Sequence, residues 1–232
     1  MNRNVVKENR YMKLITFHDP KNPVAEAFRT IRTNIQFASI DNPLRSIMVT
    51  STGPSEGKST IIANLAVVMA QSEKKVLLID ADLRKPTVHH TFHIPNRVGL
   101  TNLLVGDEEI DQVVQQSELP NLSILTSGPI PPNPAELLSS KKMSRLVEEF
   151  VSSYDLVLFD APPVVAVTDA QILSGYTDGV MLVVNAGKTH REMALKAKQQ
   201  LEHVQANVIG VILNNKDMKE QGYYYYYYGQ QR

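Results

Sequence analysis

The chain has 232 residues, 43% of them hydrophobic and 21% charged, which is enough for one domain with a substantial core. Lysine plus arginine and aspartate plus glutamate each total 24, so no overall charge points to nucleic acid. The absence of cysteine excludes disulfides, thiolate zinc sites, iron–sulfur ligation and cysteine nucleophiles, and it is compatible with a cytoplasmic location. No apolar stretch approaches the ~20 residues of a membrane span, so we expect any membrane association to depend on a partner.

Residues 1–21 are polar without sustained periodicity, and we expect them to form a flexible, extended arm. Asn22 and Pro23 then suit a helix cap and a first helical position, and the predicted helix runs to about Ala38. Its predicted buried stripe consists of Val24, Phe28, Ile31 and Ile35. The opposite face carries three charged residues, three apart: Glu26, Arg29 and Arg32. Spacing alone favours an ordinary solvated face there, with an internal ion pair.

A strand predicted over residues 46–51 leads into a phosphate-binding loop. The segment Thr52-Gly-Pro-Ser-Glu-Gly-Lys-Ser-Thr60 follows this strand and precedes an apolar helix to about Ser72, which is the order that a P-loop needs. Its glycines let successive backbone N–H groups point at phosphate oxygens, and the helix start adds its positive dipole end. We expect eight residues to bind nucleotide here: Gly53, Pro54, Ser55, Glu56, Gly57, Lys58, Ser59 and Thr60.

Two side chains of this loop have distinct expected roles. Lys58 would reach the β- and γ-phosphates, and the Ser59 hydroxyl would hold Mg²⁺. The general pattern has glycine where Thr52 stands. A Gly-rich surface turn is the alternative interpretation of this segment, but it would give Lys58 no role.

Two further apolar runs end in acid. The run Val76–Asp80 continues into Asp82, and the run Leu156–Asp160 is broken sharply by two prolines. Such runs suit parallel strands covered on both faces, and ligands bind beyond the carboxyl ends of these strands. Alternation places Asp80 and Asp82 on the same side if the chain stays extended. Asp160, opposite a P-loop, matches the carboxylate that holds Mg²⁺ directly or through its water.

The remaining predicted elements are short helices over residues 99–105 and 110–114, a strand over 122–125, a helix from Asn133-Pro134 through Phe150, a strand over 179–184, a helix over 189–205 and a strand over 208–213. Strands and helices alternate throughout, which predicts an α/β single-domain P-loop NTPase fold, a mostly parallel sheet with helices on both faces. We expect the domain to span residues 22–217 and a tyrosine-rich tail to span residues 218–232.

Two other clusters suggest ligand binding less directly. His89, His90 and His93 have no interleaved acidic residue, which favours a polar loop or helix face over a metal site. The segment Asn214–Asp217 resembles the guanine-reading Asn-Lys-x-Asp signature with spacing one residue short, so it does not predict GTP specificity. We still expect the Asn214 amide, at a strand end, to contact a purine base.

The motifs of this chain, in their order along the sequence, resemble those of the bacterial tyrosine kinases. Thr52–Thr60, Val76–Pro86 and Leu156–Pro163 resemble the Walker A, Walker A′ and Walker B motifs of that family. Glu26-Ala-Phe-Arg-Thr-Ile-Arg32 resembles its Glu-x-x-Arg-x-x-Arg oligomerisation motif. The C-terminal run resembles its autophosphorylation cluster: Tyr223, Tyr224, Tyr225, Tyr226, Tyr227 and Tyr228. The resemblance covers nearly the whole chain.

The resemblance implies an ATP- and Mg²⁺-dependent protein-tyrosine kinase that phosphorylates the tail of another copy in a ring-shaped homo-oligomer, as well as other tyrosine-bearing proteins. It implies a separate membrane-spanning activator, similar to polysaccharide co-polymerases, that recruits the chain to the inner face of the membrane. It also implies a role in exopolysaccharide, capsule or biofilm matrix production.

Residue roles also follow from the resemblance. The implied catalytic residues are Lys58, Asp80 and Asp82, and the implied Mg²⁺ ligands are Ser59, Asp82 and Asp160. Asp80 would accept or orient the tyrosine proton, although spacing does not determine how Asp80 and Asp82 divide their roles. The resemblance implies that an interface between subunits contains Glu26, Arg29 and Arg32.

An ATPase switch of the partitioning type, similar to MinD or ParA, is the alternative on the same fold. Those proteins carry an extra lysine just after the first P-loop residue, where this chain has Gly53. The related iron–sulfur carriers use cysteines, which this chain lacks. Both differences favour the kinase.

Overall fold

A computed structural model describes residues 14–38 and 42–216 of the chain. Most of the expected N-terminal arm and the entire tyrosine cluster lie outside the described residues. Among the residues described, no helix combines the length and the apolar character needed to cross a membrane.

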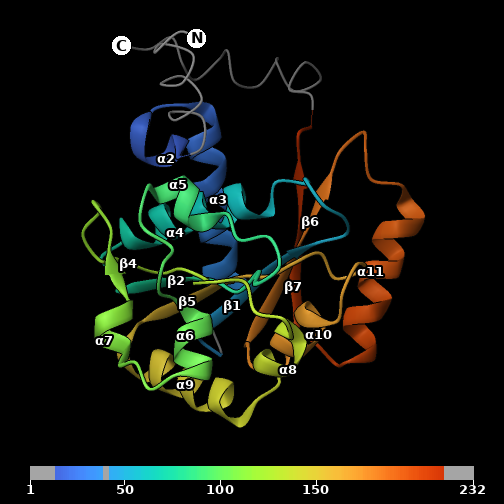
Figure 1. Cartoon of the computed structure of the whole chain (residues 1–232). Coiled ribbons are helices and arrows are strands. Elements are labelled where there is room, and N and C mark those ends of the chain that lie inside the picture. The colour runs from blue at the N-terminus through green and yellow to red at the C-terminus, as the bar shows by residue number, and fades with distance from the viewer. Residues whose placement is uncertain (1–13, 39–41, 217–232) are drawn as a thin grey trace, which may run out of the picture.

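A seven-stranded sheet forms the centre of the molecule, with the strand order β3-β4-β2-β5-β1-β6-β7 (Figure 1). All neighbouring strands are parallel except β3, which pairs antiparallel with β4. The strands are β1 (Ser46–Ser51), β2 (Val76–Asp80), β3 (Gln115–Gln116), β4 (Leu122–Leu125), β5 (Leu156–Asp160), β6 (Gly179–Asn185) and β7 (Val208–Asn214). The predicted strands are confirmed, and β3 is an edge strand too short for a sequence pattern to indicate.

Helices cover both faces of this sheet. The described helices are α2 (Ile15–His18), α3 (Pro23–Ala38), α4 (Lys58–Ala70), α5 (Val88–Phe92), α6 (Leu100–Val105), α7 (Ile110–Val113), α8 (Pro134–Leu138), α9 (Lys141–Ser153), α10 (Asp169–Ser174) and α11 (Arg191–His203). One core cluster joins the sheet to α3 and α4, and the other joins it to α6, α9, α10 and α11. The predicted α/β fold is therefore confirmed.

The helix that follows the P-loop is buried along almost its whole length. Residues 61–70 of α4 are all buried, because this segment is apolar on every side and packs between the sheet and α2 and α3. The strands beneath it, β2, β5 and β1, are neighbours in the sheet. Their register sets Asp80 opposite Asp160, and Asp160 opposite Val49, two residues before the end of β1. The acidic strand ends therefore meet beside the P-loop.

The N-terminal segment differs from the extended arm that we expected. Residues 15–18 form α2, and Thr16 is fully buried. The backbone N–H and hydroxyl of Thr16 donate to Asn64 Oδ1 on α4, at 3.1 and 2.9 Å. Within α3, Phe28 and Ile35 are buried and Ile31 is partly buried, as predicted, but Val24 is exposed and Ala25 takes its place in the buried stripe.

The helix predicted through Phe150 is two helices. Helix α8 ends at Leu138, and α9 begins after Ser140, whose hydroxyl accepts a hydrogen bond from Met143 N at 3.2 Å. Ser140 thus caps a new helix. Helical periodicity continues across this break, so the pattern alone did not indicate it.

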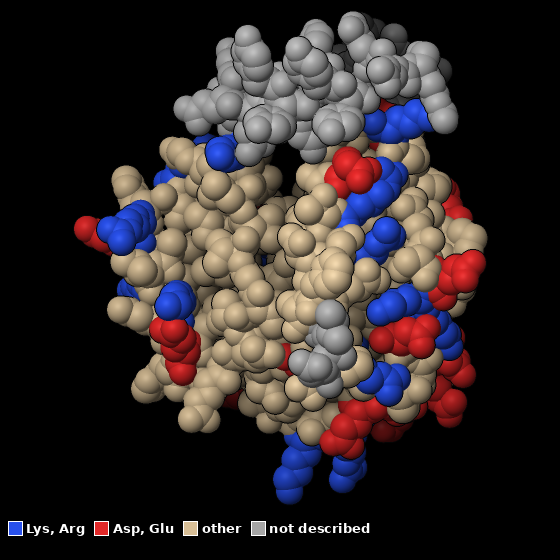
Figure 2. All heavy atoms as spheres, turned by 180° about the vertical axis from the view of Figure 1, so that it is seen from behind, with Lys and Arg blue, Asp and Glu red and all other residues tan. Residues whose placement is uncertain are grey.

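The back of the molecule is largely uncharged in its middle, with Lys, Arg, Asp and Glu gathered toward its margins (Figure 2). A hollow of about 200 Å³ lies between α3 and the edge strand β7, and only uncharged residues line it. Exposed apolar side chains stand on these two elements: Phe37, Val211 and Leu213.

Candidate active site

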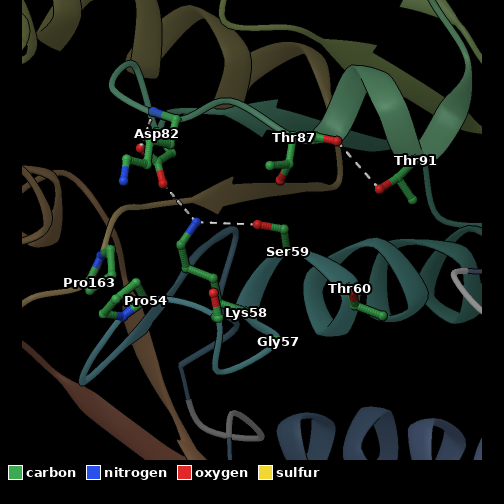
Figure 3. A pocket seen from close by; sticks show the side chains of 11 residues that line it. Pro54, Gly57, Lys58, Ser59, Thr60, Asp82, Thr87, Thr91 and Pro163 are labelled. Carbon is green, nitrogen blue, oxygen red and sulfur yellow. Dashed lines mark hydrogen bonds and ion pairs between the residues drawn. The ribbon is translucent and has the colours of Figure 1, made fainter.

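A cavity of about 350 Å³ lies over the P-loop, at the carboxyl ends of the central strands (Figure 3). Six residues that were expected to bind nucleotide line it: Pro54, Ser55, Gly57, Lys58, Ser59 and Thr60. The rest of its wall consists of Asp82, Lys85, Thr87, Thr91 and Pro163. Gly53 and Glu56 belong to the same loop but do not line the cavity.

The backbone of the P-loop is sharply curled. Ser55 and Gly57 have φ values of 61° and 93°, in the left-handed region. Helix α4 begins at Lys58, and no side chain caps its N-terminus. The N–H groups of its first turn have no intrahelical partner, so they suit an anion, and the helix dipole favours negative charge there. This geometry confirms the local structure that the sequence predicts for a P-loop.

Lys58 connects the three expected acidic and hydroxyl ligands. Its Nζ lies 2.9 Å from Asp82 Oδ2, 3.2 Å from Asp160 Oδ1 and 3.2 Å from Ser59 Oγ. Burial by itself lowers the pKa of Lys58, but the carboxylates of Asp160 and Asp82 outweigh this effect and hold its pKa above the usual value. Lys58 therefore remains a cation in a nearly buried position.

Asp80 lies behind the cavity wall and is fully buried. Its Oδ2 accepts hydrogen bonds from the backbone N–H groups of Thr87 and Val88, both at 2.9 Å, whereas its Oδ1 has no partner. Burial, together with the charge of Asp160, raises the pKa of Asp80 to about 8. Burial also raises the pKa of Asp160, although the Lys58 ammonium opposes this rise.

The oxygen atoms gathered here fit Mg²⁺. Asp82, Asp160 and Ser59 all contact one ammonium group, and the buried Oδ2 of Asp160 has no partner. Mg²⁺ is usually bound by one or two carboxylates together with substrate phosphates and water, rather than by an all-protein cage. No group of three or more His, Asp or Glu that could hold a metal ion is found in the described part of the chain.

Sequence reasoning missed an ion pair beside the cavity. Arg84 follows Asp82 in the chain and forms two hydrogen bonds to the buried carboxylate of Asp169, at 2.8 and 2.9 Å. Asp169 is the first residue of α10. No spacing in the sequence could link two residues 85 positions apart.

Other expected site residues lie apart from the cavity. Asn214 Nδ2 donates to the backbone carbonyl of Glu56 at 2.9 Å, and Asn214 does not line the cavity. Gly57 has a φ of 93°, which residues with side chains rarely adopt, and a Cβ atom there would also stand 2.3 Å from the same Nδ2, so both features favour glycine. The expected contact of Asn214 with a purine base stays a prediction.

The three charged residues of α3 all have partners within the chain. Arg29 lies 2.6 Å from Glu26 and also donates to Pro20 O at 2.7 Å. Arg32 donates to Val68 O, in the last turn of α4, at 2.8 Å. The internal ion pair expected from spacing is therefore present, and a role in oligomerisation stays a prediction.

Comparison with known proteins identifies the family. Residues 44–216 match a family described as an AAA domain. The chain is 54% identical over 213 residues to tyrosine-protein kinase YwqD of Bacillus subtilis (strain 168), covering 90% of both chains. The chain belongs to the bacterial tyrosine kinases. This kinase is also 38% identical over 211 residues to the putative tyrosine-protein kinase CapB of Staphylococcus aureus, covering 90% of this chain and 92% of CapB.

Solved structures agree with this assignment. The kinase superimposes on the chimerical protein CapA2B2 with a TM-score of 0.86 and 43% identity, over 88% of this chain and 90% of that one. The kinase domain of Escherichia coli tyrosine kinase ETK gives 0.84 at 36% identity, over 87% and 79%. MinD from Pyrococcus horikoshii, complexed with Mg-ADP, shares the fold alone, with a TM-score of 0.65 at 23% identity over 76% and 72%. The chain is thus a protein-tyrosine kinase built on the fold of P-loop NTPases.

Proposed function

We propose that this kinase transfers the γ-phosphoryl group of ATP to the tyrosines at positions 223–228 of another copy of the chain. The convergence of Lys58, Ser59, Asp82 and Asp160 on one point beside the P-loop is the observation that supports this proposal most directly. Six consecutive tyrosines near the end of the same chain supply the acceptor.

Phosphoryl transfer depends mainly on positioning and charge neutralisation. In the proposed mechanism the P-loop N–H groups and Lys58 hold the phosphates of ATP. Ser59, Asp82 and Asp160 would hold Mg²⁺, which would neutralise negative charge on the phosphates. The tyrosine oxygen attacks the γ-phosphorus, the bond from that phosphorus to the β–γ bridging oxygen breaks, and ADP leaves.

The phenolic proton needs an acceptor, for which we propose Asp80. A base works best when its pKa lies near the operating pH, and the raised pKa of Asp80 meets this condition. The buried Oδ1 of Asp80 has no hydrogen-bond partner, but Asp80 does not line the cavity. Asp82 lines the cavity and is the other candidate. Comparing Asp80→Asn with Asp82→Asn tests the choice, because only loss of the base should change the pH profile of the transfer step.

We propose further that the kinase acts as a homo-oligomeric ring, with Glu26, Arg29 and Arg32 at the contact between subunits. A head-to-tail contact presents the tail of one subunit to the cavity of the next. Replacing Arg29 by alanine should lower the assembly mass measured by light scattering, because the change removes a charge at the proposed contact and leaves exposed Glu26 without its partner. An unchanged mass would contradict this part of the proposal.

A membrane-spanning activator and a role in capsule or exopolysaccharide production complete the proposal. The names CapB and CapA2B2 among similar proteins support it. In this scheme the activator recruits the kinase, whose described residues include no membrane-spanning helix, to the inner face of the membrane.

Phosphosite mapping tests the central proposal. The full chain is incubated with ATP and Mg²⁺, with and without the cytoplasmic segment of a candidate activator, and phosphotyrosine is located by mass spectrometry. We expect modification within 223–228 and its loss in Lys58→Met, since Lys58 is the cation at the P-loop. Phosphorylation of Lys58→Met at the rate of the parent would refute the proposal. Nucleotide-dependent dimers without phosphotyrosine would instead favour a partitioning-type ATPase, whose fold this chain shares.

A further inference from the structure

Glu56 lies in the P-loop, yet its carboxylate binds protein groups outside the cavity. It is buried, and its Oε2 accepts a hydrogen bond from the backbone N–H of Thr52 at 2.8 Å. Its Oε1 accepts from the hydroxyls of Thr52 and Thr189. A buried carboxylate with three donors is a strong structural anchor, because hydrogen bonds to a charged group are stronger than neutral ones.

Thr189 comes from a different part of the chain, the connection between β6 and α11. Its hydroxyl oxygen accepts a hydrogen bond from the backbone N–H of Asn185, at 3.1 Å. Asn185 is the buried last residue of β6, which pairs with β1, the strand that leads into the P-loop. The hydroxyl has a single proton, and it is directed at Glu56. Thr189 is therefore fixed to the sheet on one side and to the loop on the other.

The segment held in this way contains the strained part of the P-loop. Ser55 is a residue other than glycine with a φ of 61°, an uncommon conformation that needs support from its surroundings. Glu56 follows it directly, and Lys58 stands two positions further on. The Thr52 hydroxyl, absent from a glycine at this position, supplies one of the three bonds. Threonine in place of the usual glycine at position 52 therefore contributes to this anchor.

We propose that Thr189 is a positioning residue that holds the P-loop, through Glu56, in the conformation that binds phosphate. Thr189 is not among the residues that line the cavity over the P-loop, and its hydroxyl reaches this loop through Glu56. The inference rests on the proposed ATP site. It adds that the β6–α11 connection stabilises the P-loop of this site.

Nucleotide affinity of the full chain tests this inference. The dissociation constant of a fluorescent N-methylanthraniloyl-ATP is measured for the parent, Thr189→Val and Thr189→Ser. Valine has the shape of threonine without the hydroxyl, and we expect about tenfold weaker binding, the loss that one hydrogen bond to a charged group brings. Serine keeps the hydroxyl and should restore affinity to within about twofold. Thr177→Val is a matched control, because Thr177 is also half-buried and its hydroxyl makes a single bond, to Ser174 O.

A double-mutant cycle separates positioning from general destabilisation. Glu56→Gln should weaken binding, and adding Thr189→Val to it should weaken binding less than in the parent, because the shared bond is already disturbed. Full additivity, or parental affinity in Thr189→Val, would overturn the inference. If Thr189→Val does not fold, as judged by thermal unfolding, the same comparison is made between Thr189→Ser and Glu56→Gln: parental affinity of Glu56→Gln then refutes the anchor. A parent chain that binds no nucleotide refutes the proposed function itself.

Discussion

The ion pair between Arg84 and Asp169 gives a prediction about stability that is independent of catalysis. Asp169 has a side-chain exposure of 0% and Arg84 one of 39%, and their two bonds are 2.8 and 2.9 Å long. Arg84→Met removes the cation and leaves the carboxylate buried. Breaking a fully buried pair in this way costs about 3–5 kcal/mol. Because water reaches part of Arg84 and screens the pair, we expect about 2–3 kcal/mol.

Thermal and urea unfolding of the full chain measure this effect. For a domain of this size, ~1 kcal/mol corresponds to about 2–4 °C in Tm, so Arg84→Met should unfold roughly 5–10 °C below the parent. Lys198→Met is the matched control, since Lys198 pairs with Glu202 at 3.2 Å and both side chains are more than half exposed, at 59% and 54%. Surface pairs of this kind contribute about 0–1 kcal/mol.

A double variant checks the cause. Adding Asp169→Asn to Arg84→Met removes the buried charge as well, so it should recover a large part of the lost stability. Equal Tm shifts for Arg84→Met and Lys198→Met would refute the reasoning, because the effect would then be unrelated to burial. A double variant less stable than Arg84→Met alone would refute it also.

The remaining predictions concern pH and helix capping. The folded-state pKa of Asp80, about 8, lies above its ordinary value, so the folded chain binds more protons than the unfolded chain and loses stability as pH rises from about 4 to 8. In the absence of nucleotide and Mg²⁺, Asp80→Asn should reduce this loss, measured as unfolding free energy at pH 5 and pH 7.5; equal losses in both proteins would contradict the assignment. Ser140→Ala removes the hydroxyl that accepts from Met143 N, and should cost about 1 kcal/mol in urea unfolding. Ser140→Asp keeps a capping oxygen and should be close to the parent, and a loss as large as that of alanine would argue against capping.

Short continuous motifs in the sequence were sufficient to predict the fold class and the main residues of the site. A P-loop is one continuous segment between a strand and a helix, so Lys58 and Ser59 are identified without tertiary information. Apolar runs that end in Asp80 and Asp160 indicate buried parallel strands, and parallel strands bring their carboxyl ends to one edge. The convergence of these acids on the P-loop follows from that topology.

Contacts between distant segments could not be predicted from the sequence. The partner of Arg84, the packing of Thr16 against Asn64 and the bond from Thr189 to Glu56 join residues 48 to 133 positions apart. Each depends on how loops and helices pack against the sheet, and no periodicity encodes that placement. The break between α8 and α9 was missed for a different reason, since one serine cap ends a pattern that otherwise continues.

The sequence by itself determined that this chain folds around a P-loop with three aspartates at neighbouring strand ends, because those features are written in short continuous motifs. Only the tertiary structure decided how the site is held. It sets Lys58 between Asp82 and Asp160, buries Asp80 behind the cavity wall, and anchors Glu56 to the β6–α11 connection. Those properties arise from packing, which brings charges into contact and excludes water from them.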